Sequence, residues 1–287
     1  MSRSKFIKSN SAKESFTTSL PAGRFSHLQL TYEGTTDAGQ TLALDDLGTL
    51  VITDRGQELQ RMPVGVLNQL ADLKGGYPAK PSGSAATAER VVSYASFGYS
   101  GFPNVLAVND QNEIEVRYIP SATIGTKFGA NAVTLRIEAW ENFEIVSRYK
   151  MKIASQNQQA SAAGTINDNI QGKNLVALLL RDPDSVVSEL NAKVGDKVLI
   201  DNAPFSIVKD ETNIINRIES ADNELAEVAI SQNGVKGGTF NNGGTIQTTF
   251  SGAGTMELYK VSFEWLSEAQ VQRNRQQVEA YLRTLGN

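Results

Sequence analysis

The sequence has no cysteine and only one histidine among its 287 residues. Without cysteine, disulfide frameworks, thiolate metal sites, iron–sulfur clusters and cysteine nucleophiles are excluded. The single histidine, His27, alternates with Leu28, Leu30 and Tyr32 in the run HLQLTY, which predicts that it lies on the polar face of a strand. A catalytic triad or an imidazole metal site would have to be built on this residue alone. Most hydrolytic and zinc chemistries therefore lack their usual groups.

Long apolar runs and a strong excess of one charge are also missing. No run approaches the length needed to span a bilayer, and the first residues lack the apolar core of a signal peptide. With a net charge of −4, the sequence shows no strong overall electrostatic attraction for nucleic acid. Any contact with a membrane is therefore expected at its surface.

The first thirteen residues depart from this balance, because they contain four basic residues and no acid: Arg3, Lys5, Lys8 and Lys13. Two interpretations stay open for this segment. It is either an arm that contacts anionic lipid or nucleic acid, or a frayed terminus in solution.

Short β-branched and aromatic runs, bounded by Gly, Asn, Asp or Pro, fill most of the sequence. Runs such as FSHLQLTYEG, EIEVRYIP, AVTLRIEAWE and MELYKVSFEW predict strands, and 24 glycines supply tight turns. Helical spacing is confined to residues 64–73, 212–218 and 267–285. Thr212 or Asn213 is expected to cap the second helix, and Ser267 with Gln270 forms a capping box for the third. The sequence leaves open whether the third helix packs on its own domain or on a neighbouring subunit.

One pattern occurs twice. When residues 28–70 are compared with the residues 148 positions further on, thirteen of the seventeen apolar residues meet an apolar partner. Matched pairs include Leu28/Val176, Leu30/Leu178, Leu50/Val198, Ile52/Ile200, Leu59/Ile207, Leu67/Ile215 and Leu70/Ile218. Each half also closes on an alternating strand that ends in a tryptophan, Trp140 or Trp265.

The repeat predicts two β domains of one design. Each half has about seven or eight strands and one short helix after an early strand pair, which suits a two-sheet sandwich. An immunoglobulin-like sandwich lacks its paired cysteines here, so the inserted helix and long loops favour a jelly roll. The first half is longer, and the Gly/Pro/Ser-rich segment 74–84 is the expected surface excursion.

The segments SLPAGRFSHLQLTYEGTT, VITDRGQELQRMPVGVLNQL with its second copy, and ELYKVSFEWLSEAQVQRNR resemble double jelly-roll major capsid proteins. The resemblance is to the tailless icosahedral phages with an internal membrane, in particular the corticovirus-like group. It spans most of the chain in order and architecture, and no single residue in it is diagnostic.

The resemblance implies an all-β chain with two jelly rolls in tandem, a few short helices and a C-terminal helix. The expected domains are a basic arm (1–14), a first jelly roll (15–153), a linker (154–173), a second jelly roll (174–266) and the helix (267–287). The implied role is that of a structural, non-enzymatic major capsid protein, which forms pseudo-hexagonal homotrimers in an icosahedral shell around a lipid membrane. Its implied partners are further copies of itself, penton and minor membrane proteins of the virion, and no sequence-specific nucleic acid.

In this interpretation the protein is made in the host cytoplasm and resides in the virion. The basic residues Arg3, Lys5, Lys8 and Lys13 would face lipid headgroups, and the excursion at 74–103 would crown the outer side of the shell.

No catalytic, cofactor-binding or metal-binding residue is assigned. Calcium stays possible, since some relatives bind it and Asp45 with Asp46, Asp182 with Asp184, and Asp201 with Asn202 are oxygen-rich clusters at turns.

Two other classes remain as alternatives. A jelly-roll glycosidase or lyase would need paired carboxylates, and Glu138 and Glu141 beside Trp140 are the candidates. These two glutamates are expected on opposite faces of one strand, which suits shared chemistry poorly. A receptor-binding or minor spike protein, or a carbohydrate-binding sandwich, shares the expected fold and is not separated by sequence.

Overall fold

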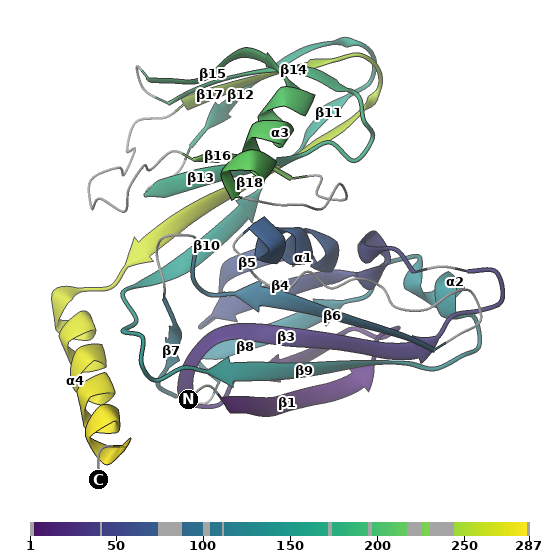
Figure 1. Cartoon of the computed structure of the whole chain (residues 1–287). Helices are drawn as coiled ribbons and strands as arrows, with labels where there is room; N and C mark the ends of the chain where they lie inside the picture. The colour runs from purple at the N-terminus through teal and green to yellow at the C-terminus, as the bar shows by residue number, and fades with distance from the viewer. Residues whose placement is uncertain are drawn as a thin grey trace. The chain divides into compact units, whose positions relative to one another are not determined.

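The computed structural model describes residues 3–40, 42–73, 88–99, 104–110, 112–171, 174–194, 197–216, 225–229 and 244–285. The chain forms two compact units (Figure 1). Unit 1 comprises Met1–Met151 with Trp265–Asn287, and unit 2 comprises Lys152–Glu264. The chain thus leaves unit 1 once and returns to it for its C-terminal helix.

Unit 1 is built on two four-stranded antiparallel sheets with the orders β1-β9-β3-β6 and β2-β8-β4-β5. Short β7 pairs with β3, and β10, whose first residues Tyr149–Met151 belong to unit 1, follows β5 in the sheet order. The bounds in chain order are β1 Arg3–Ser11, β2 Phe16–Ser19, β3 Gly23–Thr35, η1 Leu44–Leu47, β4 Thr49–Asp54, β5 Gln57–Pro63, α1 Val64–Leu73, β6 Ala88–Ser96, β7 Leu106–Val108, β8 Ile114–Ile119, α2 Ile124–Phe128, β9 Val133–Glu141, β10 Tyr149–Ser155 and α4 Glu268–Leu285.

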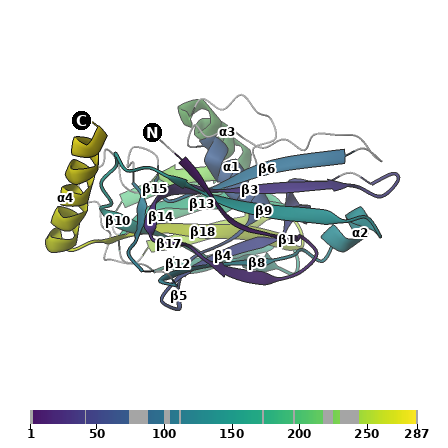
Figure 2. The same ribbon diagram turned by 90° about the horizontal axis from the view of Figure 1, so that it is seen from below.

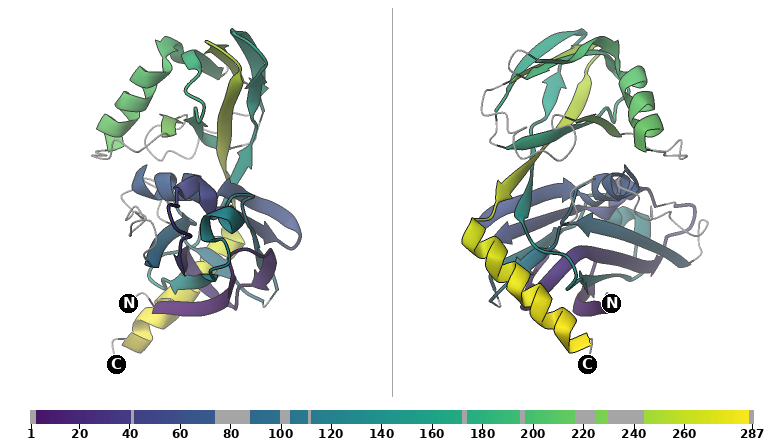
Figure 3. Two further views of the ribbon diagram at one scale, coloured as in Figure 1. Left: turned by 90° about the vertical axis from the view of Figure 1, so that its right-hand side faces the viewer. Right: turned by 60° about the vertical axis from the view of Figure 1, so that its left-hand side comes forward.

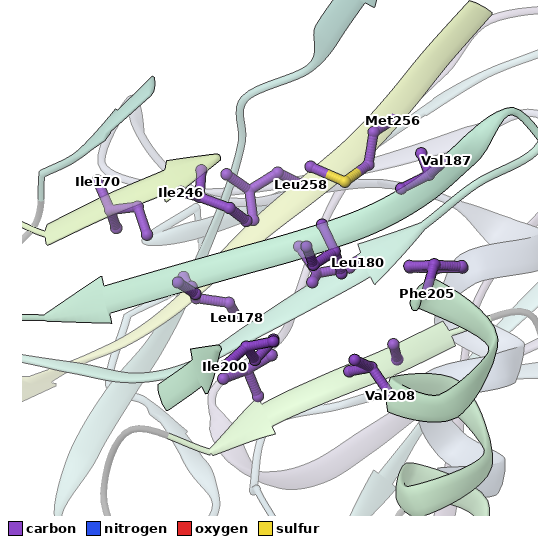
Figure 4. Close-up of a cluster of buried hydrophobic side chains, with 14 of the residues drawn as sticks. Ile170, Leu178, Leu180, Val187, Ile200, Phe205, Val208, Ile246, Met256 and Leu258 are labelled. Carbon is purple, nitrogen blue, oxygen red and sulfur yellow. The ribbon is translucent and has the colours of Figure 1, made fainter. Parts of the chain in front are cut away.

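Unit 2 has the same kind of sheets, β12-β17-β14-β15 and β16-β13-β18, with β11 paired to β18. Its elements are β11 Gln158–Ala160, β12 Gly164–Ile170, β13 Leu175–Arg181, β14 Val187–Val194, β15 Lys197–Pro204, α3 Phe205–Asn216, β16 Leu225–Ala229, β17 Gly244–Phe250 and β18 Gly254–Trp265. Apolar side chains from both sheets and from α3 meet in its core (Figure 4), with Leu178, Leu180, Ile246 and Leu258 fully buried.

Alternation of burial explains why these runs form strands. In β8 every second residue, beginning with Ile114, is buried, and β9 shows the same period from Val133 onward. This period of two puts one row of side chains into the sandwich and the other row outside it. The β4–β5 connection is a two-residue turn in which Arg55 and Gly56 both have positive φ, 48° and 82°. That backbone belongs to the turn type whose twist matches paired strands.

A buried tyrosine pair holds unit 1 together at the point where the N-terminal segment meets the core. The Tyr32 hydroxyl donates to the Leu47 carbonyl at 2.9 Å, and the Tyr118 hydroxyl lies 3.0 Å from the Ala12 carbonyl and 2.9 Å from that of Leu47. Both rings are fully buried, and burial raises the pKa of each phenol. The two hydroxyls therefore stay protonated and tie η1 and the end of β1 to strands of both sheets.

The duplication predicted from the sequence is present in the strand order. Strands β1–β6, β8 and β9 correspond one by one to β11–β18, and each pair occupies the same place in its sheet. The helix also recurs, since α1 lies between β5 and β6 and α3 between β15 and β16. Both units therefore have jelly-roll topology.

The predicted register of the repeat is correct in its first part and wrong in its second. Leu30 and Leu178 lie in the corresponding strands β3 and β13, but Leu50 lies in β4 whereas Val198 lies in β15, the counterpart of β5. The connection from β3 to β4 spans residues 36–48, and the one from β13 to β14 only residues 182–186. Because this connection is shorter, the spacing between corresponding residues falls below 148 after it. A comparison without gaps therefore aligns β4 with β15 instead of β14.

The junctions β5–α1 and β15–α3 show which residues of the two units correspond. Pro63 ends β5 and Pro204 ends β15, and a helix follows each of them directly. Proline lacks the N–H that a strand ladder needs, which ends the strand at this point. The first and fourth residues of each helix then face the core, namely Val64 and Leu67 in α1 and Phe205 and Val208 in α3.

Two of the expected segments outside the jelly rolls, the basic arm and the linker, are strands of the two units. Most of the basic arm 1–14 is strand β1, paired with β9. The expected linker 154–173 contains β11 and β12, so unit 2 begins at Lys152. Strand β12 is an edge strand whose exposed residues are polar, which is why its composition resembles that of a linker.

The predicted helix bounds are correct for α1 and wrong for α3. Helix α1 has the predicted bounds, whereas α3 begins seven residues before Thr212, at Phe205. Thr212 is not an N-cap, because its hydroxyl donates to the Val208 carbonyl inside the helix. Of the excursion expected at 74–103, residues 74–87 and 100–103 lie outside the described residues, and Ala88–Ser96 is strand β6 in the sheet.

We predict that Tyr118→Phe lowers the free energy of unfolding by about 1–3 kcal/mol, because it leaves a buried carbonyl without its donor. Urea unfolding at pH 7 measures this change. Tyr94→Phe is the matched control, since Tyr94 is a partly exposed ring on the outside of β6. Equal midpoints for the two variants would contradict the role assigned to the tyrosine pair.

Candidate interaction surfaces

The outward face of the β1-β9-β3-β6 sheet carries a row of aromatic side chains, which we call the outer aromatic face: Phe6, His27, Tyr94 and Trp140. Strands β1, β9, β3 and β6 lie side by side in Figure 2. His27 stacks on Trp140, with ring centroids 5.6 Å apart and an interplanar angle of 16°, and meets the edge of Tyr94 at 5.5 Å. The Trp140 indole N–H donates to Gln29 Oε1 at 3.1 Å.

His27 lies where the alternation predicted, on the face opposite the buried Leu28 and Leu30. Partial burial between its aromatic neighbours lowers the pKa of His27 to about 4. The ring is therefore neutral at pH 7. The His27 Nδ1 atom lies 3.0 Å from the Ser26 hydroxyl. The ring is thus held by its neighbours on the outer aromatic face.

The four basic residues predicted to face lipid are separated by the fold. Arg3 begins β1 opposite Glu141, and Lys5 Nζ lies 2.5 Å from Glu141 Oε1. Lys13 Nζ donates to the carbonyls of Gly129 and Asn131, at 2.7 Å each. Lys8 is exposed on β1. Two of the four charges are thus engaged within unit 1, and Lys8 is the one that the described structure presents to solvent.

The two glutamates considered for acid–base chemistry lie on opposite faces of β9, as predicted. Glu141 is buried and pairs with Lys5, whereas Glu138 lies on the outer side and pairs with Arg136 at 2.8 Å. Each carboxylate has its own cation. The pair therefore does not form a common acid–base site.

The carboxylate clusters considered for calcium serve the local backbone. Asp182 accepts hydrogen bonds from the amides of Val186 and Val187 at 3.0 and 2.8 Å, and Asp184 accepts one from the Thr255 amide at 2.8 Å.

In unit 1, Asp46 accepts hydrogen bonds from the Thr123 hydroxyl and the Ala43 amide. Asp201 accepts a hydrogen bond from the Asn202 side chain at 3.4 Å. Across the described ranges, no group of three or more His, Cys, Asp or Glu residues is placed to hold a metal ion.

Helix α4 packs on unit 1 through one polar face, a contact that the sequence left open (Figure 3). Its capping box is confirmed, because Ser267 and Gln270 are hydrogen-bonded to each other. Asn274 donates to the Ser147 carbonyl at 3.1 Å, Gln277 Oε1 accepts from Arg24 at 3.1 Å, and Tyr281 stacks on Phe143 at 4.7 Å.

The expected apolar stripe of α4 is only partly used, since Val278 is buried but Leu282 is 47% exposed. Two cavities of about 290 and 370 Å³ lie along the contact and share Ala107, Asn109 and Gln277. Arg24 lines the second cavity, and desolvation lowers its pKa. The sequence signal for this contact is the spacing of Asn274, Gln277 and Tyr281, which puts all three on one side of the helix.

Within the residues that the structure describes, no helix is both long and apolar enough to cross a bilayer. No family model and no curated protein matches the sequence.

Solved structures, in contrast, are similar to nearly the whole chain. The major capsid protein P2 of bacteriophage PM2 matches with a TM-score of 0.62 and 12% identity, covering 93% of this chain and 99% of that chain. The PBCV-1 virus capsid protein matches with a TM-score of 0.66 and 8% identity, over 92% and 93% of the two chains. The STIV major capsid protein matches with a TM-score of 0.62 and 11% identity, over 94% and 98%.

The fold class predicted from the sequence is therefore confirmed. The chain has the double jelly-roll fold, the fold of these viral capsid proteins, with few helices and a C-terminal helix.

We predict that His27 makes stability depend on pH. The unfolded imidazole binds a proton near its ordinary pKa of 6.5, whereas folded His27 does so only near pH 4. Its contribution is thus fully present above pH 6.5 and is lost as the pH falls toward 4. Urea midpoints measured at pH 7 and pH 5 should fall further for the native chain than for His27→Gln. Parallel pH profiles would show that His27 does not titrate in this window.

Proposed function

We propose that this chain is a major capsid protein, with a structural and non-enzymatic role. The observation that carries the proposal is the tandem of two jelly rolls with the same strand order and the same inserted helix. The likeness to capsid proteins runs over at least 92% of this chain and at least 93% of theirs, so the comparison leaves no large part of either chain unmatched. A fold alone does not fix a role, and the surfaces supply the remaining arguments.

A tandem of like sandwiches suits the tiling of a shell. Three copies of a chain with two similar units offer six similar lateral faces, which is the requirement for hexagonal packing by a trimer. We therefore infer a homotrimer of pseudo-hexagonal outline that assembles with further trimers into an icosahedral shell around a membrane. The protein would be made in the host cytoplasm and reside in the virion, where penton and minor membrane proteins complete the particle.

The chemistry of the described side chains supports a structural role. Glu138 and Glu141 are each held by a separate cation, and His27 is neutral and packed between aromatic rings. Asp182 and Asp184 are occupied by backbone amides. These polar groups stabilise turns and strand pairs, and the one pair considered for catalysis, Glu138 and Glu141, lies on opposite faces of β9.

Contact with lipid is the second part of the proposal, and among the four basic residues we take Lys8 as its first candidate. Lys5 and Lys13 are engaged within unit 1, whereas Lys8 is exposed. A single lysine near an anionic bilayer contributes on the order of 1 kcal/mol. One such contact per chain becomes substantial when many copies face one membrane, because the contacts act together.

The oligomer tests the capsid proposal. We predict that the purified full-length chain has three times the mass of the 31.0 kDa monomer when measured by light scattering at micromolar concentration. Negative-stain electron microscopy should show particles with six corners. A stable monomer would contradict the shell role and favour a receptor-binding, minor spike or carbohydrate-binding protein. A glycan array would then separate these alternatives.

Lipid contact is tested separately. We predict that Lys8→Gln weakens binding to vesicles containing anionic phosphatidylserine by about fivefold at low salt, as expected for the loss of one surface charge. Lys193→Gln, at an exposed lysine of unit 2, is the control and should bind as the native chain does. Equal flotation of both variants with the vesicles would remove Lys8 from the proposed membrane contact.

A further inference from the structure

A buried arginine without a carboxylate partner lines one of the two cavities under α4. Arg24 of β3 is only 5% exposed. Its guanidinium donates to Gln277 Oε1 at 3.1 Å and to the Ile145 carbonyl at 2.9 Å, and its Nε has no partner. Both acceptors are neutral, and no described carboxylate forms an ion pair with Arg24. Because burying an unpaired charge is costly, a guanidinium in such a place is normally accompanied by an anion.

A second arginine without an ion pair lies at the neighbouring cavity. Arg273 of α4 lines the cavity of about 290 Å³, and none of the residues that the structure describes forms an ion pair with it. Arg273 and Gln277 are four residues apart on the helix, so their side chains are neighbours on one side of it. Gln277 accepts the hydrogen bond from Arg24 and lines both cavities. Both arginines therefore lie next to Gln277, which the two cavities share.

The other cations of the two cavities already have carboxylate partners. Arg55 Nη2 lies 3.1 Å from Glu113 Oε1, and Lys150 pairs with Asp54. Glu113 is the only acidic residue among the described ones that line either cavity. Two of the four positive charges are thus balanced within unit 1, and those of the two arginines next to Gln277 are not.

We propose that the cavities under α4 bind one phosphate group per chain, held between Arg24 and Arg273. A phosphate group carries about 1.5 to 2 negative charges near pH 7, which matches two unpaired guanidinium groups, and it offers several acceptor oxygens. Asn109 lines both cavities and adds a side-chain amide as a further donor. All of these residues belong to unit 1, so the site is complete within one chain whether or not copies assemble.

The phosphate group belongs either to a free ion or to a lipid headgroup. The cavity of about 370 Å³ has Val108, Phe143 and Tyr281 among its walls, which suit the glycerol and first methylenes of a lipid. A free phosphate ion would use the same two arginines without these walls. A comparison of inorganic phosphate with a water-soluble, short-chain phosphatidic acid separates the two sources.

Titration of the native full-length chain tests the site directly. Inorganic phosphate is added in a calorimeter at an ionic strength kept constant with chloride, and we expect one binding site per chain. The thermal midpoint should rise with phosphate concentration, because a ligand of the folded state stabilises it. Acetate at the same concentrations should leave the midpoint unchanged, since its single charge balances only one arginine. An equal rise with acetate would overturn the assignment to phosphate.

Variants of α4 locate the site. Arg273→Gln removes one of the two unpaired charges at an exposed position and should weaken phosphate binding by about tenfold or more. Arg275→Gln is the matched control, because Arg275 is an exposed arginine of the same helix that lines neither cavity, and it should bind phosphate as the native chain does. Arg24→Gln should abolish the rise of the midpoint, with circular dichroism as the check that it is folded.

The outcomes also identify the source of the phosphate. Phosphatidic acid that binds more tightly than inorganic phosphate by about tenfold or more indicates a lipid headgroup, and a smaller difference indicates the free ion. A native chain that binds no phosphate overturns the site. Equal weakening in Arg273→Gln and Arg275→Gln would show a general effect of charge and also overturn it. None of these results depends on the trimer, so the capsid proposal stands or falls separately.

Discussion

The structure depends on one constraint, that every backbone N–H and C=O of a strand must be paired or face water. Each unit satisfies most of these groups within its two antiparallel sheets. Along each strand, successive side chains point alternately into the sandwich and out of it. The residual groups lie at the sheet edges, and the fold treats the edges unequally. Strand β12 ends its sheet with exposed polar residues, whereas β1 and β15 each carry one exposed large apolar side chain, Phe6 or Val198, among charged residues.

Packing in the two cores follows from the same geometry. Residues such as Leu28 and Leu30 in unit 1, or Leu178 and Leu180 in unit 2, project from the central strands β3 and β13 and are fully buried. The tyrosine pair of unit 1 adds polar anchors to this apolar interior, because its hydroxyls reach carbonyls that would otherwise be unpaired. The helix after Pro63 or Pro204 then closes one end of each sandwich with its first and fourth side chains. A duplicated core thus leaves the outer surfaces free to diverge between the units.

The fold also decides which charged side chains at the surface stay available. The four basic residues near the N-terminus look alike in sequence, yet the fold pairs Lys5 with Glu141, ties Lys13 to two carbonyls and leaves Lys8 in solvent. Acidic turns that could hold a cation in isolation are used as acceptors for nearby amides, as in Asp182. Chemistry-bearing residues can be identified from sequence, but the partners of Lys5 and Lys13 come from segments more than a hundred residues away, which a local pattern does not contain.

The sequence by itself determined the all-β class, the closing strands that contain Trp140 and Trp265, and the helix at 64–73, because each rests on periodicity within a short window. It also indicated the duplication, through a match of apolar positions over residues 28–70. It did not reveal that the basic arm is strand β1, that the polar segment 154–173 forms β11 and β12, or that α3 begins at Phe205. Those assignments depend on pairing with distant strands, which stabilises polar edge segments whose own composition favours a loop. Only the tertiary structure decided where the open edges lie and which charges remain available, since both are set by what the rest of the chain has already covered.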